Sequence, residues 1–182
     1  GIGKDGINTV NYIYSKLGSH YYADFGYIIC DTEETNIKQS QIVSSILFKD
    51  KFRLSQDEII ELEEKTNNSI IIYVFANTEG EVGEFLLDEI LKILDQKSEI
   101  RMYFITTPFE DDKLTKAQHT IDKIRQHSNG VIELSSKYIA QESPINQKSK
   151  NNVDLKEIQL NLIKKTIYAS LWSGYIATKL EI

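Results

Sequence analysis

The chain has 182 residues, of which 41% are apolar and 26% are charged, and its net charge is −6 at neutral pH. This composition is typical of one soluble globular domain, and the acidic balance argues against a nucleic-acid partner. The longest apolar run, Ile70 to Ala76, is too short to cross a membrane, and a single cysteine, Cys30, favours a reducing, cytoplasmic compartment over a disulfide framework.

The first residues, Gly1-Ile2-Gly3-Lys4-Asp5-Gly6, form a glycine-rich turn. Apolar residues then recur at helical spacing from Ile7 to Leu17, and Gly18 ends this pattern. Glycines let a backbone approach a ligand closely, and a helix N-terminus attracts anions, so we expect a phosphate group near Gly3 and Gly6. Such a turn normally follows a buried strand, so we expect a first strand to be missing before Gly1.

The rest of the chain alternates between short apolar runs and amphipathic patterns. Ser55-Gln56-Asp57-Glu58 is a capping box, Thr115 is a candidate helix cap, and residues 77–83 are predicted to form a loop. Residues 37–48 have mixed periodicity and are predicted to be partly helical, whereas residues 141–152 are polar and are predicted to be a mobile loop. The remaining predictions are strands at residues 26–30, 69–75, 100–106 and 131–134, and helices at residues 55–64, 85–94, 115–129 and 153–171.

This alternation predicts a three-layer, Rossmann-like α/β fold, in which helices cover both faces of a parallel sheet. Ligands of such sheets bind beyond the carboxyl ends of the strands. The segments expected at that edge are Gly1 to Gly6, Asp31 to Glu33, Ala76 to Gly83, Thr106 to Asp112, and Ser135-Ser136.

One interpretation of the glycine turn is the dinucleotide fingerprint G-x-G-x-x-G. The chain would then be an NAD(P)-binding Rossmann oxidoreductase, with Asp31 accepting a hydrogen bond from the ribose. The separation between Gly6 and Asp31 is 25 residues, somewhat more than the usual gap of about 20.

A second interpretation accounts for more of the chain. The stretch from Gly1 to Asn11 resembles the first glycine loop of the FtsZ/tubulin family, and Tyr27 to Glu33 resembles the family's second strand. Phe104-Ile105-Thr106-Thr107-Pro108-Phe109 resembles the family's Val-Val-Thr-Lys-Pro-Phe strand end. The resemblance implies a single nucleotide-binding domain over residues 1–182, without the family's second domain.

The resemblance also implies a ligand and partners. The ligand would be GTP or GDP with Mg²⁺, and the partner would be a second copy or an FtsZ/tubulin-like protein. Asp112 and Lys116 replace a family Glu and Arg, and Glu157 matches an acidic residue that faces the guanine. The nucleotide-binding residues that the resemblance implies are Gly3, Gly6, Asn8, Asp31, Thr32, Gly80, Pro108, Asp112, Lys116, Ser136 and Glu157. Each also has an ordinary interpretation as a tight turn, a cap or a solvated charge.

The departures from the family predict weaker activity. Of the family's Gly-Gly-Gly-Thr-Gly loop only Gly80 and Gly83 remain, and Glu79 and Glu81 would repel phosphate. The family's catalytic acids after the core helix have no counterpart in residues 171–182 except Glu181, so no catalytic residue is assigned. His20, His119 and His127 are scattered, and no metal motif is present. We therefore expect a divergent protein of cell division or cytoskeletal assembly, with weak nucleotide binding and impaired hydrolysis; an active, polymerising GTPase is the alternative.

Overall fold

The computed structural model describes residues 1–17, 26–50, 52–67, 69, 71–78, 81–96, 100–107, 111–135, 161–166, 168–169 and 171. In chain order its named elements are α1 (Gly3–Leu17), β1 (Ile29–Asp31), α2 (Glu34–Lys38), β2 (Ser45–Leu47), α3 (Gln56–Thr66), β3 (Ile71–Asn77), α4 (Glu81–Leu94), β4 (Ile100–Thr107), α5 (Asp111–Gln126) and β5 (Gly130–Ser135). Residues 161–166 are also helical.

All pairings between these strands are parallel, and they form two groups. β1 pairs with β2, and β4 lies between β3 and β5. Residues 1–2 join the groups: Cys30 N donates to Gly1 O at 2.9 Å, and Ile2 N donates to Phe75 O at 2.9 Å. The order is therefore β2-β1-(Ile2)-β3-β4-β5. From Ile2 the strand order runs toward β2 on one side and toward β5 on the other, so the order reverses at Ile2. Open α/β sheets bind their ligands at the point where the strand order reverses, the switch point.

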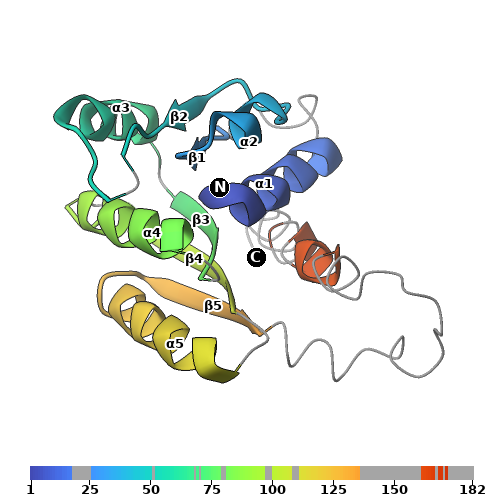
Figure 1. Cartoon of the computed structure of the whole chain (residues 1–182). Helices are drawn as coiled ribbons and strands as arrows, with labels where there is room; N and C mark the ends of the chain where they lie inside the picture. Colours follow the sequence, from blue (N-terminus) through green and yellow to red (C-terminus); the bar gives the residue numbers. More distant parts are fainter. Residues whose placement is uncertain are drawn as a thin grey trace.

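Two apolar cores lie on opposite faces of this sheet, which makes the molecule three-layered (Figure 1). One core joins the sheet to α3, α4 and α5 through residues such as Leu62, Leu87 and Ile121. The other joins it to α1 and to the helical residues near 163, through Ile13, Phe104 and Ile163. The predicted fold class, a parallel sheet covered by helices on both faces, is confirmed.

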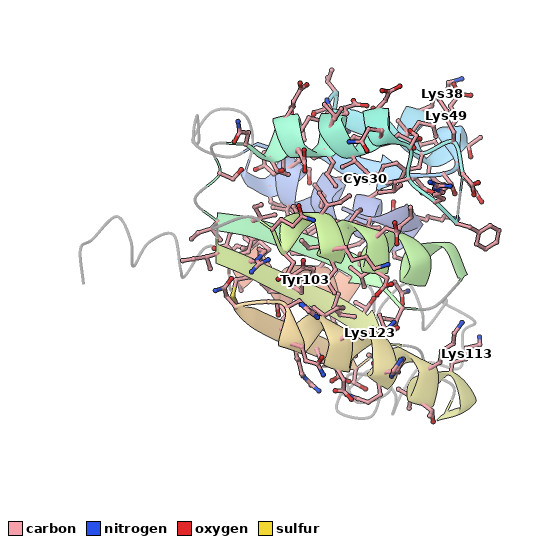
Figure 2. The ribbon with its side chains drawn as sticks, turned by 90° about the vertical axis from the view of Figure 1, so that its left-hand side faces the viewer. Cys30, Lys38, Lys49, Tyr103, Lys113 and Lys123 are labelled. Carbon is pink, nitrogen blue, oxygen red and sulfur yellow. The ribbon has the colours of Figure 1, made fainter. Side chains whose placement is uncertain are left out.

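Burial also explains the chemistry of two side chains inside these cores. Cys30 is buried, as predicted, and desolvation raises the pKa of its thiol to about 11. Tyr103 is fully buried on β4, and desolvation raises the pKa of its phenol to about 12. Figure 2 shows both residues inside the layered interior, whereas Lys49 and Lys113 lie at its periphery.

Two sequence-based predictions about the elements were wrong, and a third was confirmed only in part. Residues 37–48, predicted to be partly helical, are helical only as far as Lys38, where α2 ends, and they contain strand β2 at Ser45–Leu47. Thr115 lies inside α5 rather than at its start, since α5 begins at Asp111. The loop after β3 is shorter than predicted, because α4 begins at Glu81. Most of the predicted loop at 141–152 and helix at 153–171 lies outside the described residues.

Candidate functional site

The carboxyl ends of the parallel strands bring together segments that are far apart in the sequence. Ile2 leads into α1, β1 ends at Asp31, β3 ends at Asn77, and β4 ends at Thr107. These are the described parts of the edge that the alternating pattern predicts. Because Ile2 lies between β1 and β3, the first turn of α1 occupies the middle of this edge.

The glycines of the first turn are required by the backbone itself. Gly3 has a φ of 65°, a left-handed conformation that strains any residue with a side chain. A Cβ on Gly6 would lie 2.3 Å from the carbonyl oxygen of Phe75, which lies near the carboxyl end of β3. The start of α1 is therefore pressed against the sheet, with the N–H groups of its first turn lacking intrahelical partners.

Polar side chains surround this first turn. Asp5, half-buried, accepts a hydrogen bond from Asn77 Nδ2 at 2.6 Å, which ties α1 to the end of β3. Asn8, one turn further on, is half-buried, and the described residues provide no hydrogen bond for its amide. The first turn therefore has an amide available to a ligand but also a carboxylate, and a carboxylate opposes the binding of an anion.

Asp31 has a structural role at the end of β1. It is 2% exposed, and its Oδ1 accepts from the backbone N–H groups of Thr32 at 2.7 Å and Glu33 at 3.1 Å. Its Oδ2 accepts from Asn36 Nδ2 at 2.8 Å. Thr32 is half-buried beside it and is not a helix cap, because the N-cap position of α2 is Glu33. Asp31 thus shapes the turn that presents Thr32 at the edge.

Threonines line the ends of β3 and β4. Thr78 donates from both its N–H and its hydroxyl to Thr106 O, at 3.1 and 3.3 Å. Thr106 in turn donates to Ala76 O at 3.4 Å. The hydroxyl of Thr107 is buried and has no hydrogen-bond partner among the described residues. At the ends of β3 and β4 these hydroxyl groups make the edge polar but uncharged.

A carboxylate fixes the loop that follows β2. Glu58, 5% exposed, accepts from Lys49 N at 2.7 Å with Oε1 and from Ser55 N and Oγ at 2.6 Å with Oε2. Burial alone would raise the pKa of Glu58, but these hydrogen bonds outweigh it and lower the pKa. The capping box predicted at Ser55 and Glu58 is confirmed. The second role of Glu58, holding Lys49, was not predicted.

The remaining predicted site residues are only partly placed. Gly80, Pro108, Ser136 and Glu157 lie outside the described residues, as does Glu79. Asp112 belongs to the first turn of α5, with its side chain outside the description, and Lys116 is exposed in the second turn. The sequence analysis also did not single out Asn77, and the signal that points to it is its position at the carboxyl end of a buried apolar run.

The described residues form neither a metal site nor a membrane span. Within the described ranges, no three His, Cys, Asp or Glu side chains gather in a way that would hold a metal ion. In the same part of the chain, no helix is long and apolar enough to span a membrane. His119 and His127 are exposed on and after α5, and His127 Nδ1 lies 2.9 Å from Asp95 Oδ2.

Comparison with known proteins finds similar structures but no similar sequences. No family model matches the chain, and no curated protein matches it. CetZ from Methanosaeta thermophila matches 97% of this chain with a TM-score of 0.72 and 16% identity. A mutant FtsZ from M. jannaschii matches 92% with a TM-score of 0.76 and 12% identity, and a TubZ of type III plasmid segregation matches 93% with a TM-score of 0.67 and 13% identity.

These matches concern about half of each solved structure, because the chain covers 53% of the CetZ and FtsZ chains and 55% of the TubZ chain. At such low identity the likeness establishes the fold. The resemblance to the FtsZ/tubulin family that the short motifs indicated is confirmed at this level: the chain has the α/β fold of the corresponding half of these proteins.

Proposed function

We propose that this chain binds a guanine nucleotide at the carboxyl edge of its sheet, with the phosphates at the first turn of α1. The observation that carries the proposal is the geometry of that turn. Gly3 is left-handed, and Gly6 contacts the backbone of β3, so the start of α1 lies at the switch point of the sheet. A helix N-terminus in this position favours an anionic group.

Other residues around the turn extend the proposed site. Asn8 and Thr32 are half-buried polar residues next to it. From the family resemblance, Gly80, Pro108 and Ser136 belong to the nucleotide site, Asp112 binds the ribose, Lys116 lies near the nucleotide, and Glu157 faces the guanine. In this proposal, residues 1–182 act as one nucleotide-binding unit, and Mg²⁺ accompanies the phosphates.

The binding is proposed to be weak and hydrolysis slow. Asp5 brings a carboxylate into the first turn of α1, and Glu79 and Glu81 occupy the stretch where the family has glycines. Repulsion between carboxylates and phosphates costs most where water is partly excluded. Residues 171–182 contain no aspartate and a single glutamate, Glu181, so this stretch offers only one carboxylate that would activate water.

The environment of Asp31 favours a guanine nucleotide over a nicotinamide dinucleotide. In the dinucleotide interpretation, the Asp31 carboxylate binds the ribose. Here both of its oxygens already accept hydrogen bonds from Thr32, Glu33 and Asn36. The carboxylate is therefore engaged in shaping the turn, and because Asp31 is 2% exposed, little of it is accessible to a ribose.

We further propose that the protein works by assembly, in cell division or in a cytoskeletal system. The support is the fold shared with CetZ, FtsZ and a plasmid-segregation TubZ. Assembly with a second copy or with a related partner requires no membrane segment and no nucleic acid. Light scattering with and without GTP would detect filaments, and an unchanged signal over a wide range of protein concentration would count against self-assembly.

A thermal-shift titration tests nucleotide binding directly. GTP with Mg²⁺ at millimolar concentration should raise the melting temperature, and NAD should not. Gly3→Ala should abolish most of this shift, because alanine disfavours the left-handed conformation that presents the helix N-terminus. Gly26→Ala is the matched control, since a Cβ there meets nothing within 4 Å. No shift with GTP in the wild type would overturn the proposal, and rapid phosphate release would overturn the slow-hydrolysis part.

A further inference from the structure

One buried hydroxyl at the carboxyl edge of the sheet lacks a hydrogen-bond partner. Thr107 is the last residue of β4, it is 2% exposed, and no described group bonds to its Oγ1. A buried hydroxyl without a partner destabilises a fold, whereas valine would fill nearly the same volume without this penalty. Thr107 is therefore unfavourable for folding alone, and a hydrogen bond to a bound ligand would remove the penalty.

The neighbouring threonines at this edge already have partners. Thr106 Oγ1 donates to Ala76 O at 3.4 Å, and Thr78 Oγ1 donates to Thr106 O at 3.3 Å. These hydroxyls stabilise the ends of β3 and β4 by bonding to the backbone. Thr107 makes no such bond within the described part of the chain, so its hydroxyl differs from its neighbours in being available to another group.

Thr107 lies on the sheet face that helices α4 and α5 cover. Alternate residues of a strand project from the same face, and Tyr103 and Ile105 belong to the core beneath these helices. α5 begins at Asp111, four residues after Thr107. The hydroxyl therefore lies close to the start of α5, at the edge where parallel α/β sheets bind their ligands.

The two sides of the switch point offer different buried groups to a nucleotide. On the β1 side, both carboxylate oxygens of Asp31 already accept hydrogen bonds from nearby residues. On the side of β3 and β4, the buried hydroxyl of Thr107 has no described partner. A nucleotide whose phosphates lie at the first turn of α1 would therefore gain a hydrogen bond by extending toward β4.

The position of β4 indicates which part of the nucleotide would reach Thr107. β4 is separated from Ile2 by β3, so it lies two strand spacings, about 10 Å, from the start of α1. This is comparable with the separation between the terminal phosphate and the sugar of a nucleoside triphosphate. A threonine hydroxyl both donates and accepts, so it pairs with a neutral sugar hydroxyl without bringing a charge into a buried place.

We propose that the hydroxyl of Thr107 forms a hydrogen bond with a ribose hydroxyl of the bound nucleotide, so that the site prefers ribonucleotides to deoxyribonucleotides. The inference rests on the proposed function and adds the sugar to the groups that the site recognises. It assigns Thr107 as a residue that determines specificity.

Thermal-shift titrations with GTP and with its 2′-deoxy and 3′-deoxy analogues test this proposal. The wild type should bind GTP more tightly than at least one deoxy analogue by about three- to tenfold, as expected for one hydrogen bond. Thr107→Val should weaken GTP binding by a similar factor and remove this preference. Thr107→Ser keeps a hydroxyl and should retain the preference. Inorganic triphosphate has no sugar and should bind to the wild type and to Thr107→Val equally.

The stability of the variants without nucleotide separates ligand recognition from a role in folding. Thr107→Val should keep or raise the melting temperature, because it removes an unpaired buried hydroxyl. Thr66→Val is the matched control, since Thr66 is 5% exposed at the end of α3 and its hydroxyl donates to Leu62 O at 2.8 Å. This control should lower the melting temperature and leave the preference for GTP unchanged.

The possible failures are distinguishable. A wild type that binds GTP and both deoxy analogues equally would overturn this inference alone, as would a Thr107→Val variant that keeps the preference. A wild type that does not bind GTP would overturn the proposed function and this inference together.

Discussion

Two turns at the same edge of the sheet are held in place by different means. The turn from Gly3 to Gly6 is fixed by backbone packing, with Gly6 against Phe75 O. The loop after β2 is fixed by a side chain, because Glu58 holds Lys49 at one end and Ser55 at the other. The turn at Gly3 to Gly6 therefore leaves no room for a side chain at Gly6, whereas the loop after β2 depends on the ionised carboxylate of Glu58. Rigidity next to a site can therefore be independent of pH or tied to it.

Gly6→Ala should have the largest effect, because it breaks the turn that depends on backbone packing. The new Cβ would lie 2.3 Å from Phe75 O, so either α1 or β3 must shift. We expect the free energy of unfolding to fall by about 3 kcal/mol, as measured by urea denaturation. Gly26→Ala, where the Cβ meets nothing within 4 Å, should change it little. Equal stability of the two variants would show that α1 does not press against β3.

Glu58→Gln tests the loop that depends on a carboxylate. At pH 7 the loss of charged hydrogen bonds to Lys49 and Ser55 should lower the free energy of unfolding by about 2 kcal/mol. The pKa of Glu58 is lowered in the folded state. Its contribution is therefore complete above the pKa of an unfolded glutamate and is lost as the pH falls through the folded pKa.

Denaturation of this variant and of the wild type should therefore be compared over a pH series. The difference between them should shrink toward acidic pH. Glu64→Gln, an exposed position on the same helix, should show a small difference at every pH. A gap between wild type and Glu58→Gln that stays constant down to pH 3 would contradict the role of the ionised carboxylate.

Asp5→Asn should have the smallest effect on the fold and should sharpen the role of the first turn. The change removes a negative charge from the N-terminus of α1 and keeps a side chain that can pair with Asn77. A charge near a helix end is worth about 0.3–1 kcal/mol, so GTP affinity should rise about two- to fivefold while stability falls slightly. Titration with a fluorescent GTP analogue measures this, and high salt should reduce the gain. Weaker binding by this variant would indicate that Asp5 assists the ligand, for example through a cation.

Local signals in the sequence were sufficient for much of the fold. The near-continuous apolar runs of β3 and β4 and the capping box at Ser55 depend on neighbours along the chain, and they were predicted within a few residues. The glycines of the first turn were also identified, although Gly6 is required by the approach of Phe75, more than sixty residues away along the chain.

Features that depend on distant contacts were missed. The segment that contains β2 was predicted to be partly helical because residues 37–48 have mixed periodicity. Its conformation comes from pairing with β1. In the site, the bond between Asp5 and Asn77 joins residues 72 apart, and Lys49 is positioned by Glu58 across a loop. No periodicity of a single segment carries such information.

The two hydrogen-bonded sides of Ile2 have a consequence for cooperativity. Gly1 and Ile2 are the backbone connection between the β1–β2 pair and the β3–β5 group. β1 and β2 have three residues each, so this pair gains much of its protection from that connection. A ligand that fixes the start of α1 would therefore slow amide hydrogen exchange in the β1–β2 pair and in the β3–β5 group at once. Loss of that ligand would let the β1–β2 pair open separately from the rest of the sheet.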